Sequence, residues 1–518
     1  MADDTANPAA GRTLTYFGLG GSGIRALEPL LHLCALGLGP RQLRLVLIDP
    51  DQSNAAVKRT RALVDLYAET RRQLAAGGAP PGFFRTEVVD AVAGTPVWSP
   101  IADDDDLPDA RFATRVDRAL MRGRNAPLGQ LFDLLYADKI RDMDLGMGFR
   151  GIPSIGTVFM NRLREQAFFG QILASAQADA DSLFFAVGSI FGGTGSAAFP
   201  VVARALADGV RGRDGSADTP GIPRHRVGGA LLLPYFSLPA PPTPDAADGG
   251  PRPQAVLFAQ NAAAAIPTYA GPGGGAGYGG FYVLGDDTPR EQDRNEVGGE
   301  NQDNRPHYVE LYAALGALDF SGRGGEDPAA RLPVFHATGV AGRDPGWEDL
   351  PMSAADRKRL MGGIVAAHTF LSLFRPGGAG NPSLLDTLRG VTWMRMLNLN
   401  EPELVRRSGA LDGMGSFFRQ TWDWLGDLRG STPSMPLARV DGRPPQAVHS
   451  GEVIHGYRSN AGGGEAGHDV YHVFRHWNVA AHRRKGEGFP GFLEVMREGS
   501  EAFAGSAFAE RSNAREES

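Results

Sequence analysis

The chain has 518 residues, a net charge of −7 and an isoelectric point near 5.9. This acidic balance argues against a protein that holds nucleic acid mainly by attraction to phosphate. The one cysteine, Cys34, excludes an intramolecular disulfide, and the tail histidines have no companion cysteine or HExxH acid, so we predict no metal site. We find neither a signal-peptide pattern nor an apolar run of about 18 residues, and we therefore expect a cytoplasmic protein without a membrane span.

The first half of the chain alternates short apolar runs with amphipathic stretches, the pattern of a parallel α/β sheet whose strands are joined by helices. We expect a flexible N-terminus at 1–12 and then a nucleotide-binding domain over 13–304, with an insertion at about 70–145 where the alternation stops. Strands are predicted at 13–19, 43–48, 182–187, 226–233 and 281–284, with helices at 23–37, from about 53, and at 157–178, 197–208 and 254–265. The predicted fold class is α/β, with a Rossmann-like parallel sheet flanked by helices.

The second half of the chain has few strand signals and is predicted to be mainly helical. A long core helix is expected over 305–320, where Pro306 suits the first turn because that turn needs no amide donor. Residues 321–440 are expected to form a second, helix-rich domain with one strand at 332–339, followed by a C-terminal extension at 441–518. Helices in this half are predicted at 354–374, 383–397, 402–412 and 415–428.

The stretch from Phe185 to Pro200 is an apolar strand that breaks into a glycine turn and restarts as a helix of small residues. Glycines let the backbone approach a ligand closely, and unpaired amides at the start of a helix attract anionic oxygens. This pattern predicts a phosphate-binding turn. Its candidate binding residues are Gly188, Gly192, Gly193, Thr194, Gly195 and Ser196.

A second glycine segment, Gly18 to Gly23, follows the first predicted strand and opens the helix after it. Acids stand at the end of the next strand, where Asp49 or Asp51 could meet a ribose hydroxyl or a hydrated Mg²⁺ ion. Taken alone, such a segment is also found as a tight turn that serves only packing. No GxxxxGK[ST] motif occurs, which argues against a P-loop. The candidate binding residues of this segment are Gly20, Gly21, Ser22 and Gly23.

Together the two glycine segments resemble those of the tubulin/FtsZ superfamily, in a divergent prokaryotic form. Residues 191–198 resemble its GGGTGSG signature loop, with Phe191 where the first glycine usually stands, and Gly20–Gly23 match its N-terminal loop. The resemblance covers about residues 13–340. It implies a GTP or GDP site with Mg²⁺, in which the two loops grip opposite sides of the phosphates.

The same resemblance implies further binding residues. Segment 48–54 resembles an FtsZ stretch with an Asn-Thr-Asp-Ala core, and 151–156 is similar to a loop that senses the γ-phosphate. Two asparagines fall where tubulins place guanine-contacting groups, although Asn304 is equally suited to cap a helix without any ligand. The residues added in this way are Asn54, Ser154, Asn261 and Asn304, beside Asp49 and Asp51.

Catalytic acids are harder to assign. In tubulin and FtsZ, acids after the core helix complete the GTPase site of the neighbouring subunit, so hydrolysis requires head-to-tail assembly. The acids at this place are Asp319, Glu326 and Asp327, but the surrounding residues of the FtsZ loop are missing. A solvated loop accounts for them equally well, and the helical second half departs from the family's strand-containing second domain. Filament formation and hydrolysis therefore stay open.

Three functions remain to be distinguished. The first is a GTP-binding tubulin/FtsZ-like protein, in which the nucleotide controls assembly of a homo-oligomer or filament, or the docking of a protein partner. The second is a ThiF-like, ATP-dependent adenylating enzyme, because Gly18–Gly23 followed by 47–54 resembles that family's ATP site. That family's arginine after Ser-Asn is displaced here, and its zinc cysteines are absent. The third is a non-catalytic scaffold that keeps the tubulin fold.

Overall fold

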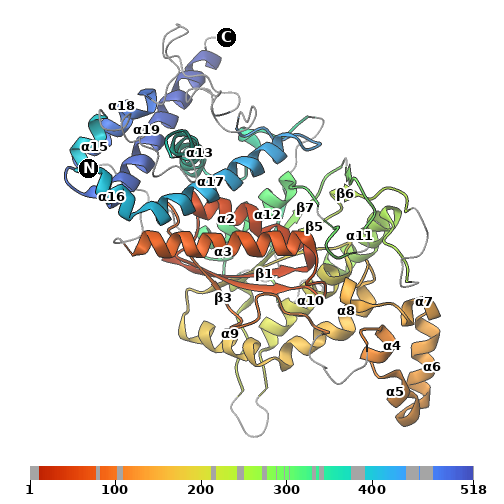
Figure 1. Ribbon diagram of the computed structural model, residues 1–518. Coiled ribbons are helices and arrows are strands. Elements are labelled where there is room, and N and C mark those ends of the chain that lie inside the picture. Colours follow the sequence, from red (N-terminus) through yellow and green to blue (C-terminus); the bar gives the residue numbers. More distant parts are fainter. Residues whose placement is uncertain are drawn as a thin grey trace.

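A parallel sheet of seven strands runs through the centre of the molecule in the order β3–β2–β1–β4–β5–β7–β9 (Figure 1). β1 and β4 are buried along their whole length, because strands covered by helices on both faces carry near-continuous apolar runs. These strands are β1 (Thr13–Leu19), β2 (Gln42–Ile48), β3 (Glu87–Asp90), β4 (Leu183–Ser189), β5 (Val227–Leu232), β7 (Gly280–Leu284) and β9 (Val334–Ala337). The predicted α/β class, with a parallel sheet flanked by helices, is confirmed.

The structure is a computed structural model that describes part of the chain. The described residues are 11–76, 82–101, 109–211, 218–241, 250–270, 277–287, 289–296, 298–302, 304–329, 334–337, 343–374, 391–438, 454 and 471–516. Most of the expected flexible N-terminus, residues 1–10, lies outside these ranges. Among the described residues, no helix combines the length and the apolar character that crossing a membrane requires.

Helices cover both faces of the sheet (Figure 1). On one face lie α2 (Leu27–Ala35), α3 (Ala55–Ala75) and α12 (Tyr308–Arg323), and on the other lie α8 (Pro153–Met160), α9 (Ala167–Ala178) and α10 (Gly193–Asp208). Two glycines of β5 allow both layers to approach closely. A Cβ atom on Gly228 would lie 2.8 Å from the ring of Phe320 on α12, and one on Gly229 would lie 2.8 Å from the ring of Phe199 on α10.

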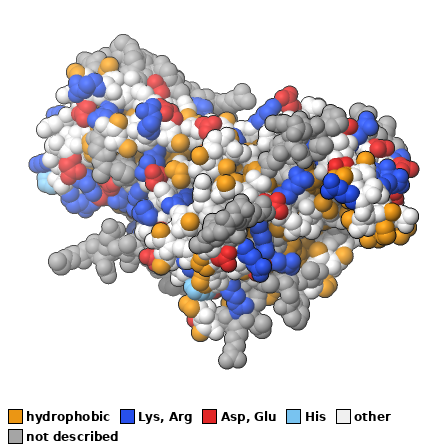
Figure 2. All heavy atoms as spheres, turned by 90° about the horizontal axis from the view of Figure 1, so that it is seen from below, with side chains coloured by type: hydrophobic (Ala, Val, Ile, Leu, Met, Phe, Trp, Pro, Cys, Tyr) orange, Lys and Arg blue, Asp and Glu red, His pale blue; other side chains and the backbone are white. Residues whose placement is uncertain are grey.

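A small helical region stands beside the sheet, within the predicted insertion. It consists of α4 (Phe112–Arg115), α5 (Arg118–Arg124), α6 (Ala126–Leu135) and α7 (Asp138–Arg141). Its core is separate from the main core and consists of Ile101, Phe112, Phe132, Met143, Leu145, Phe149, Ile155 and Phe159. Hydrophobic side chains also gather on its outer surface, at the right-hand edge of Figure 2. They include the exposed leucines Leu120, Leu128, Leu131, Leu134 and Leu135, a grouping typical of interaction surfaces.

The C-terminal helices pack against α2 and α3 on one side of the sheet (Figure 1). They are α13 (Ala354–Leu373), α15 (Thr392–Leu397), α16 (Glu401–Arg406), α17 (Ser408–Arg429), α18 (Tyr471–Arg483) and α19 (Gly488–Glu516). The ring of Phe417 lies 5.6 Å from that of Tyr67 on α3, and Trp424 stacks on His32 of α2 at 4.9 Å. One continuous hydrophobic core therefore extends from the sheet into the helical region.

Several elements differ from the sequence prediction. β3 lies inside the segment predicted as an insertion, because a strand of only four residues leaves almost no periodic signal. The predicted helix 23–37 begins earlier, as α1 (Gly20–Arg25), and is divided from α2 at Ala26. The core helix α12 begins at Tyr308, after an N-cap at His307 rather than around Pro306. Part of the predicted helix 383–397 lies outside the described residues.

Candidate functional site

An open cavity of about 140 Å³ lies at the carboxyl ends of β1 and β4. The strand order reverses here, because the chain leads from β1 to β2 and β3 on one side and from β4 to β5 and β7 on the other. Such a switch point leaves a crevice between the loops that follow the two strands. The residues that line this crevice are far apart in the sequence and extend from the first glycine turn to the segment before α12.

The first glycine turn joins β1 to α1. Gly20 has a φ of +71°, which favours glycine, and a Cβ atom there would lie 3.0 Å from the Gly195 amide nitrogen. The two glycine turns therefore touch. Gly21 faces the cavity, because a Cβ atom on it would meet only Asp49 Oδ2 at 3.9 Å. Gly23 does not line the cavity: its Cβ position is 2.1 Å from the carbonyl oxygen of Val187, so it serves the packing of α1 on β4.

The second glycine turn joins β4 to α10. Gly192 is the N-cap of α10, and no side chain caps the first amides of this sixteen-residue helix. Gly192, Gly193, Thr194 and Gly195 line the cavity beside Gly20, Gly21 and Ser22 of the first turn. Gly188 and Ser196 do not line it. The hydroxyl of Ser196 donates back to the Gly192 carbonyl, and Gly188 lies behind the turn, against Gly195 and Leu19.

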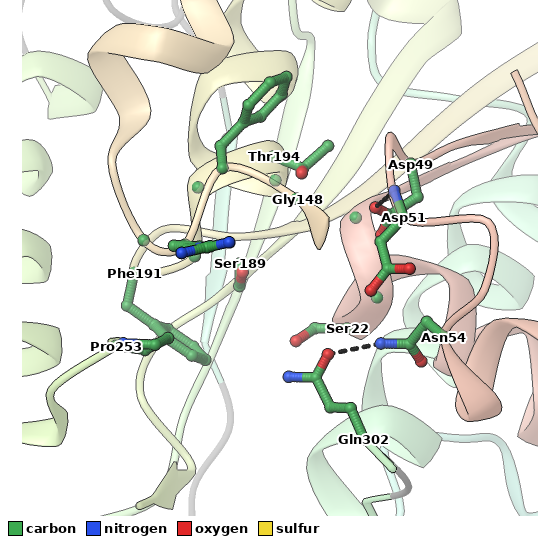
Figure 3. Close-up of a pocket in the computed structure, with 18 of the residues that line it drawn as sticks. Ser22, Asp49, Asp51, Asn54, Gly148, Ser189, Phe191, Thr194, Pro253 and Gln302 are labelled. Carbon is green, nitrogen blue, oxygen red and sulfur yellow. Dashed lines mark hydrogen bonds between the residues drawn. The ribbon is translucent and has the colours of Figure 1, made fainter. Parts of the chain in front are cut away.

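Asp49, Asp51 and Asn54 form one wall of the cavity, opposite Ser189, Phe191 and Thr194 (Figure 3). The Asp51 amide donates to Asp49 Oδ1 at 2.9 Å, and the Gly299 amide donates to Asp51 Oδ2 at 2.7 Å. Asn54 caps α3 through bonds from the Ala56 and Val57 amides, and its Nδ2 donates to Gln302. The three side chains are thus held in place by the loops around them.

Burial raises the pKa of Asp49 to about 8, and the neighbouring Asp51 adds to this effect. Hydrogen bonds from the Asp51 and Gly21 amides oppose the shift. A cation beside the carboxylates would offset the cost of charging Asp49. Two carboxylates on one wall fit Mg²⁺, which usually binds through one or two carboxylates, water and substrate phosphates. Within the described part of the chain, no cluster of three or more His, Cys, Asp or Glu side chains could hold a metal alone.

A third segment, residues 147–151, spans the cavity between its two walls. A Cβ atom on Gly148 would approach the Asp51 side chain to 4.0 Å, while Phe149 packs against Gly193, whose Cβ position is 2.7 Å from Phe149 Cβ. Arg150 and Gly151 line the cavity. Ser154, predicted in the following loop, is exposed on α8 and does not line it.

The other end of the cavity is apolar. Phe191 lies 5.3 Å from Phe236 and 4.9 Å from Phe258 between ring centres, and Leu238 and Pro253 complete this end. Phe191, which stands where the GGGTGSG signature has its first glycine, therefore contributes to an aromatic cluster. Gln302 and Asn304 add amide groups at the cavity's edge. Asn261 is half-buried one turn beyond Phe258, on α11 (Ala255–Ala270), and does not line the cavity.

Arg25 of α1 also lines the cavity and is tied to the start of α12. Its Nε donates to Glu310 Oε1 at 2.9 Å and its Nη2 to the Tyr235 hydroxyl at 2.8 Å. The Tyr235 hydroxyl itself donates to Glu310 Oε1 at 2.8 Å. Burial opposes the charge of Arg25, but Glu310 and Tyr235 hold its pKa above the ordinary value. These groups form a rigid polar connection beside the cavity.

The acids predicted after the core helix lie at the opposite edge of the sheet. The Glu326 amide donates to the carbonyl of His225, just before β5 begins, which places this loop at the amino ends of the strands. Asp319 accepts bonds from Tyr282 and Arg323, and Glu326 pairs with Arg323 and His336. Asp327 is exposed. Within one chain, these three acids are not brought to the cavity.

The structure adds cavity residues that the sequence patterns did not mark. They include Arg25, Met147, Gly148, Arg150, Ser189, Phe236, Phe258 and Gln302. Most stand in irregular loops or on helix faces that carry no motif, so only the fold brings them together. Gly148 and Gly151, on either side of Arg150, indicated a tight loop, but they did not indicate that this loop lies at the cavity.

No protein-family model matches the sequence, and no curated protein matches it.

Proposed function

We propose that this protein binds a guanine nucleotide, GTP or GDP with Mg²⁺, as a divergent member of the tubulin/FtsZ superfamily. One observation carries the proposal: two glycine turns, about 170 residues apart in the sequence, line a single cavity at the switch point of a parallel sheet. Ligands of such sheets bind in the crevice at the carboxyl ends of the strands.

The chemistry of the cavity supports a nucleotide. The uncapped start of α10 offers amide donors and the positive end of a helix dipole, which suit phosphate. Asp49 and Asp51 offer oxygen ligands for Mg²⁺, and the aromatic end offers apolar faces for a base. The amides of Gln302 and Asn304 can donate to and accept from a guanine edge. The choice of guanine over adenine rests on these amides and on the tubulin/FtsZ resemblance.

Calorimetric titration of the full chain with GTP, GDP and ATP, each with Mg²⁺, tests this proposal. Gly21→Asp is the informative variant, because its carboxylate would face the cavity with space to enter it. Gly21→Ala is the matched control. Gly193→Asp is less suitable, since any Cβ atom there would collide with Phe149. We expect guanine-selective binding that Gly21→Asp weakens at least ~10-fold through repulsion of phosphate, and that Gly21→Ala leaves within ~3-fold.

Other outcomes point to the alternative functions. Selective binding of ATP would favour the ThiF-like adenylating enzyme. Failure of folded wild-type protein to bind any of the three nucleotides would favour the scaffold.

Self-assembly and hydrolysis are further parts of the proposal. Acids at the amino ends of the strands could reach the cavity of a second copy only by head-to-tail stacking, as in the superfamily. This supports a filament or homo-oligomer in which Asp319, Glu326 or Asp327 completes a GTPase site. Asp319 and Asp327 are exposed, whereas Glu326 is buried, and Asp319 also accepts bonds from Tyr282 and Arg323. Nucleotide-controlled docking of a protein partner is the alternative use of the same site.

A further inference from the structure

The outer face of α6 is apolar although it is open to solvent. The helix has a single charged residue, Asp133, and its inner face buries Gly129 and Phe132. A helix that is apolar on nearly all sides is normally buried on all sides. On the outer side, however, five leucines of α5 and α6 are between 44% and 82% exposed. We call this group the leucine surface; it consists of Leu120, Leu128, Leu131, Leu134 and Leu135.

The leucine surface lies at one end of the molecule. The helices α4–α7 stand at the edge of the structure, and the C-terminal helices lie at the opposite end (Figure 1). Figure 2 shows hydrophobic side chains gathered on this outer edge. A second molecule can therefore reach the leucine surface without meeting the C-terminal helices. A contiguous apolar surface of this kind marks a site of interaction with another molecule.

The order of residues around α6 is self-complementary about Leu131. Leu128 and Leu134 stand three positions before and after it. Arg124 and Asp138 stand seven positions before and after it. Suppose that two α6 helices lie antiparallel across a twofold axis at Leu131. Each Leu131 then meets its own copy, each Leu128 meets Leu134 of the second copy, and each Arg124 meets Asp138 of the second copy.

The charges at the two ends of α6 are open to a second molecule. Arg124 is exposed and forms no ion pair with another described residue. Asp138 pairs with Arg141 of its own chain but is still 83% exposed. Because α6 has ten residues, a length of about 15 Å, these charges lie on either side of the leucines. A parallel pair would place arginine against arginine and aspartate against aspartate, so the charges favour the antiparallel pair.

We propose that the leucine surface is the interface of a twofold homodimer, in which two α6 helices pair antiparallel about Leu131. The inference does not depend on the proposed nucleotide site. It also differs from head-to-tail stacking, because the same surface of both copies forms the contact. Five leucines and one pair of charges from each copy make a small interface, so we expect a dissociation constant roughly in the micromolar range.

Sedimentation equilibrium of the full chain without nucleotide tests the proposal. We expect the mass of wild type to rise from 55.0 kDa toward twice that value as the concentration is raised to about 100 μM. Leu131→Glu places two carboxylates at the twofold axis and should weaken association at least ~10-fold. Leu257→Glu is the matched control, because Leu257 on α11 is similarly exposed but lies outside the leucine surface. This control should associate like wild type.

Two charge reversals test the antiparallel pairing itself. Arg124→Glu places glutamate against Asp138, and Asp138→Lys places lysine against Arg124, so each variant alone should associate about 10-fold more weakly than wild type. Mixed in equal amounts, the two variants should form a heterodimer about as readily as wild type dimerises, because both end contacts then join opposite charges. Restoration by mixing supports this geometry and no other pairing of α6.

Three results would overturn the inference. The first is wild-type protein that stays monomeric at every concentration, which would leave the leucine surface to a partner other than this chain. The second is a Leu131→Glu variant that associates like wild type. The third is a mixture of the charge variants that associates no better than either variant alone. Circular dichroism of each variant checks that the fold is retained, and none of these results depends on whether the protein binds a nucleotide.

Discussion

At the scale of single residues, Asp49 is a carboxyl group whose charge is opposed by its surroundings. It directly follows β2, is 5% exposed, and has its pKa raised to about 8 by burial and by Asp51. An unfolded chain would release this proton near pH 4. Between about pH 4 and 8 the folded protein therefore binds more protons than the unfolded chain, and its stability falls as the pH rises.

Asp49→Asn should remove this loss of stability. The amide oxygen can still accept the Asp51 N–H, but it carries no charge. We expect the variant to match wild type near pH 4 and to become more stable than wild type toward pH 8, by at most about 1.4 kcal/mol per pH unit. Urea unfolding at pH 5 and pH 8 measures the difference. Asp65→Asn, at an exposed site of α3, is the control, and parallel pH dependence of Asp49→Asn and wild type would refute the prediction.

At the scale of elements, α1 shows that glycines of one motif have different tasks. Gly21 faces the cavity with free space around its Cβ position, while Gly23 lies against the backbone of β4. A backbone carbonyl cannot move aside as a flexible side chain can. The same six-residue helix therefore contains a glycine that leaves room for ligand and a glycine that leaves room for a strand.

Gly23→Ala and Gly21→Ala should consequently behave in opposite ways. The added methyl group of Gly23→Ala would lie 2.1 Å from the Val187 oxygen, and we expect a loss of about 3 kcal/mol or more, or failure to fold. Gly21→Ala should be neutral or stabilising by up to ~1 kcal/mol, because alanine favours a helix. Thermal melts followed by circular dichroism compare the two. Similar destabilisation by both would show that the contact at Val187 is not what requires glycine.

At the scale of the whole molecule, a buried ion pair connects the first helix to the core helix. Arg25 and Glu310 are 285 residues apart, and their side chains are 4% and 3% exposed. Glu310 also accepts from the His307 amide in the capping box that starts α12. The Glu310 carboxylate thus connects Arg25 at the cavity and Tyr235 after β5 to the start of α12.

Removing one partner of this pair should cost far more than removing both. Glu310→Gln would leave the Arg25 charge buried, with an expected loss of about 3–5 kcal/mol, whereas Arg25→Met with Glu310→Met should lose less than that single change. Glu300→Gln, which breaks the exposed pair with Lys58, should leave the stability close to that of wild type, because solvent screens this pair. Denaturant unfolding of the four proteins gives the comparison. A double variant as unstable as Glu310→Gln, or less stable than it, would contradict the prediction.

Local patterns in the sequence predict much of the fold. The predicted strands at 13–19 and 226–233 match β1 and β5 closely, and Asn54 caps α3 next to the predicted helix start. Each of these depends on a few adjacent residues, such as an apolar run or a capping side chain. β3 was not predicted because a strand of four residues leaves almost no periodic signal.

The sequence by itself determined the two glycine turns, the acids at the end of β2 and the α/β class, because turn conformation and strand burial are properties of neighbouring residues. The tertiary structure decided which residues share a cavity. Gly23, Gly188 and Ser196 contribute to packing and do not line the cavity, and Asn261 and Ser154 also lie outside it. Arg25, Arg150, Phe236 and Phe258 line the cavity although no sequence pattern marked them. The physical reason is that the loops lining this cavity are far apart in the sequence and come together because the strand order reverses between β1 and β4, and no local pattern encodes that order.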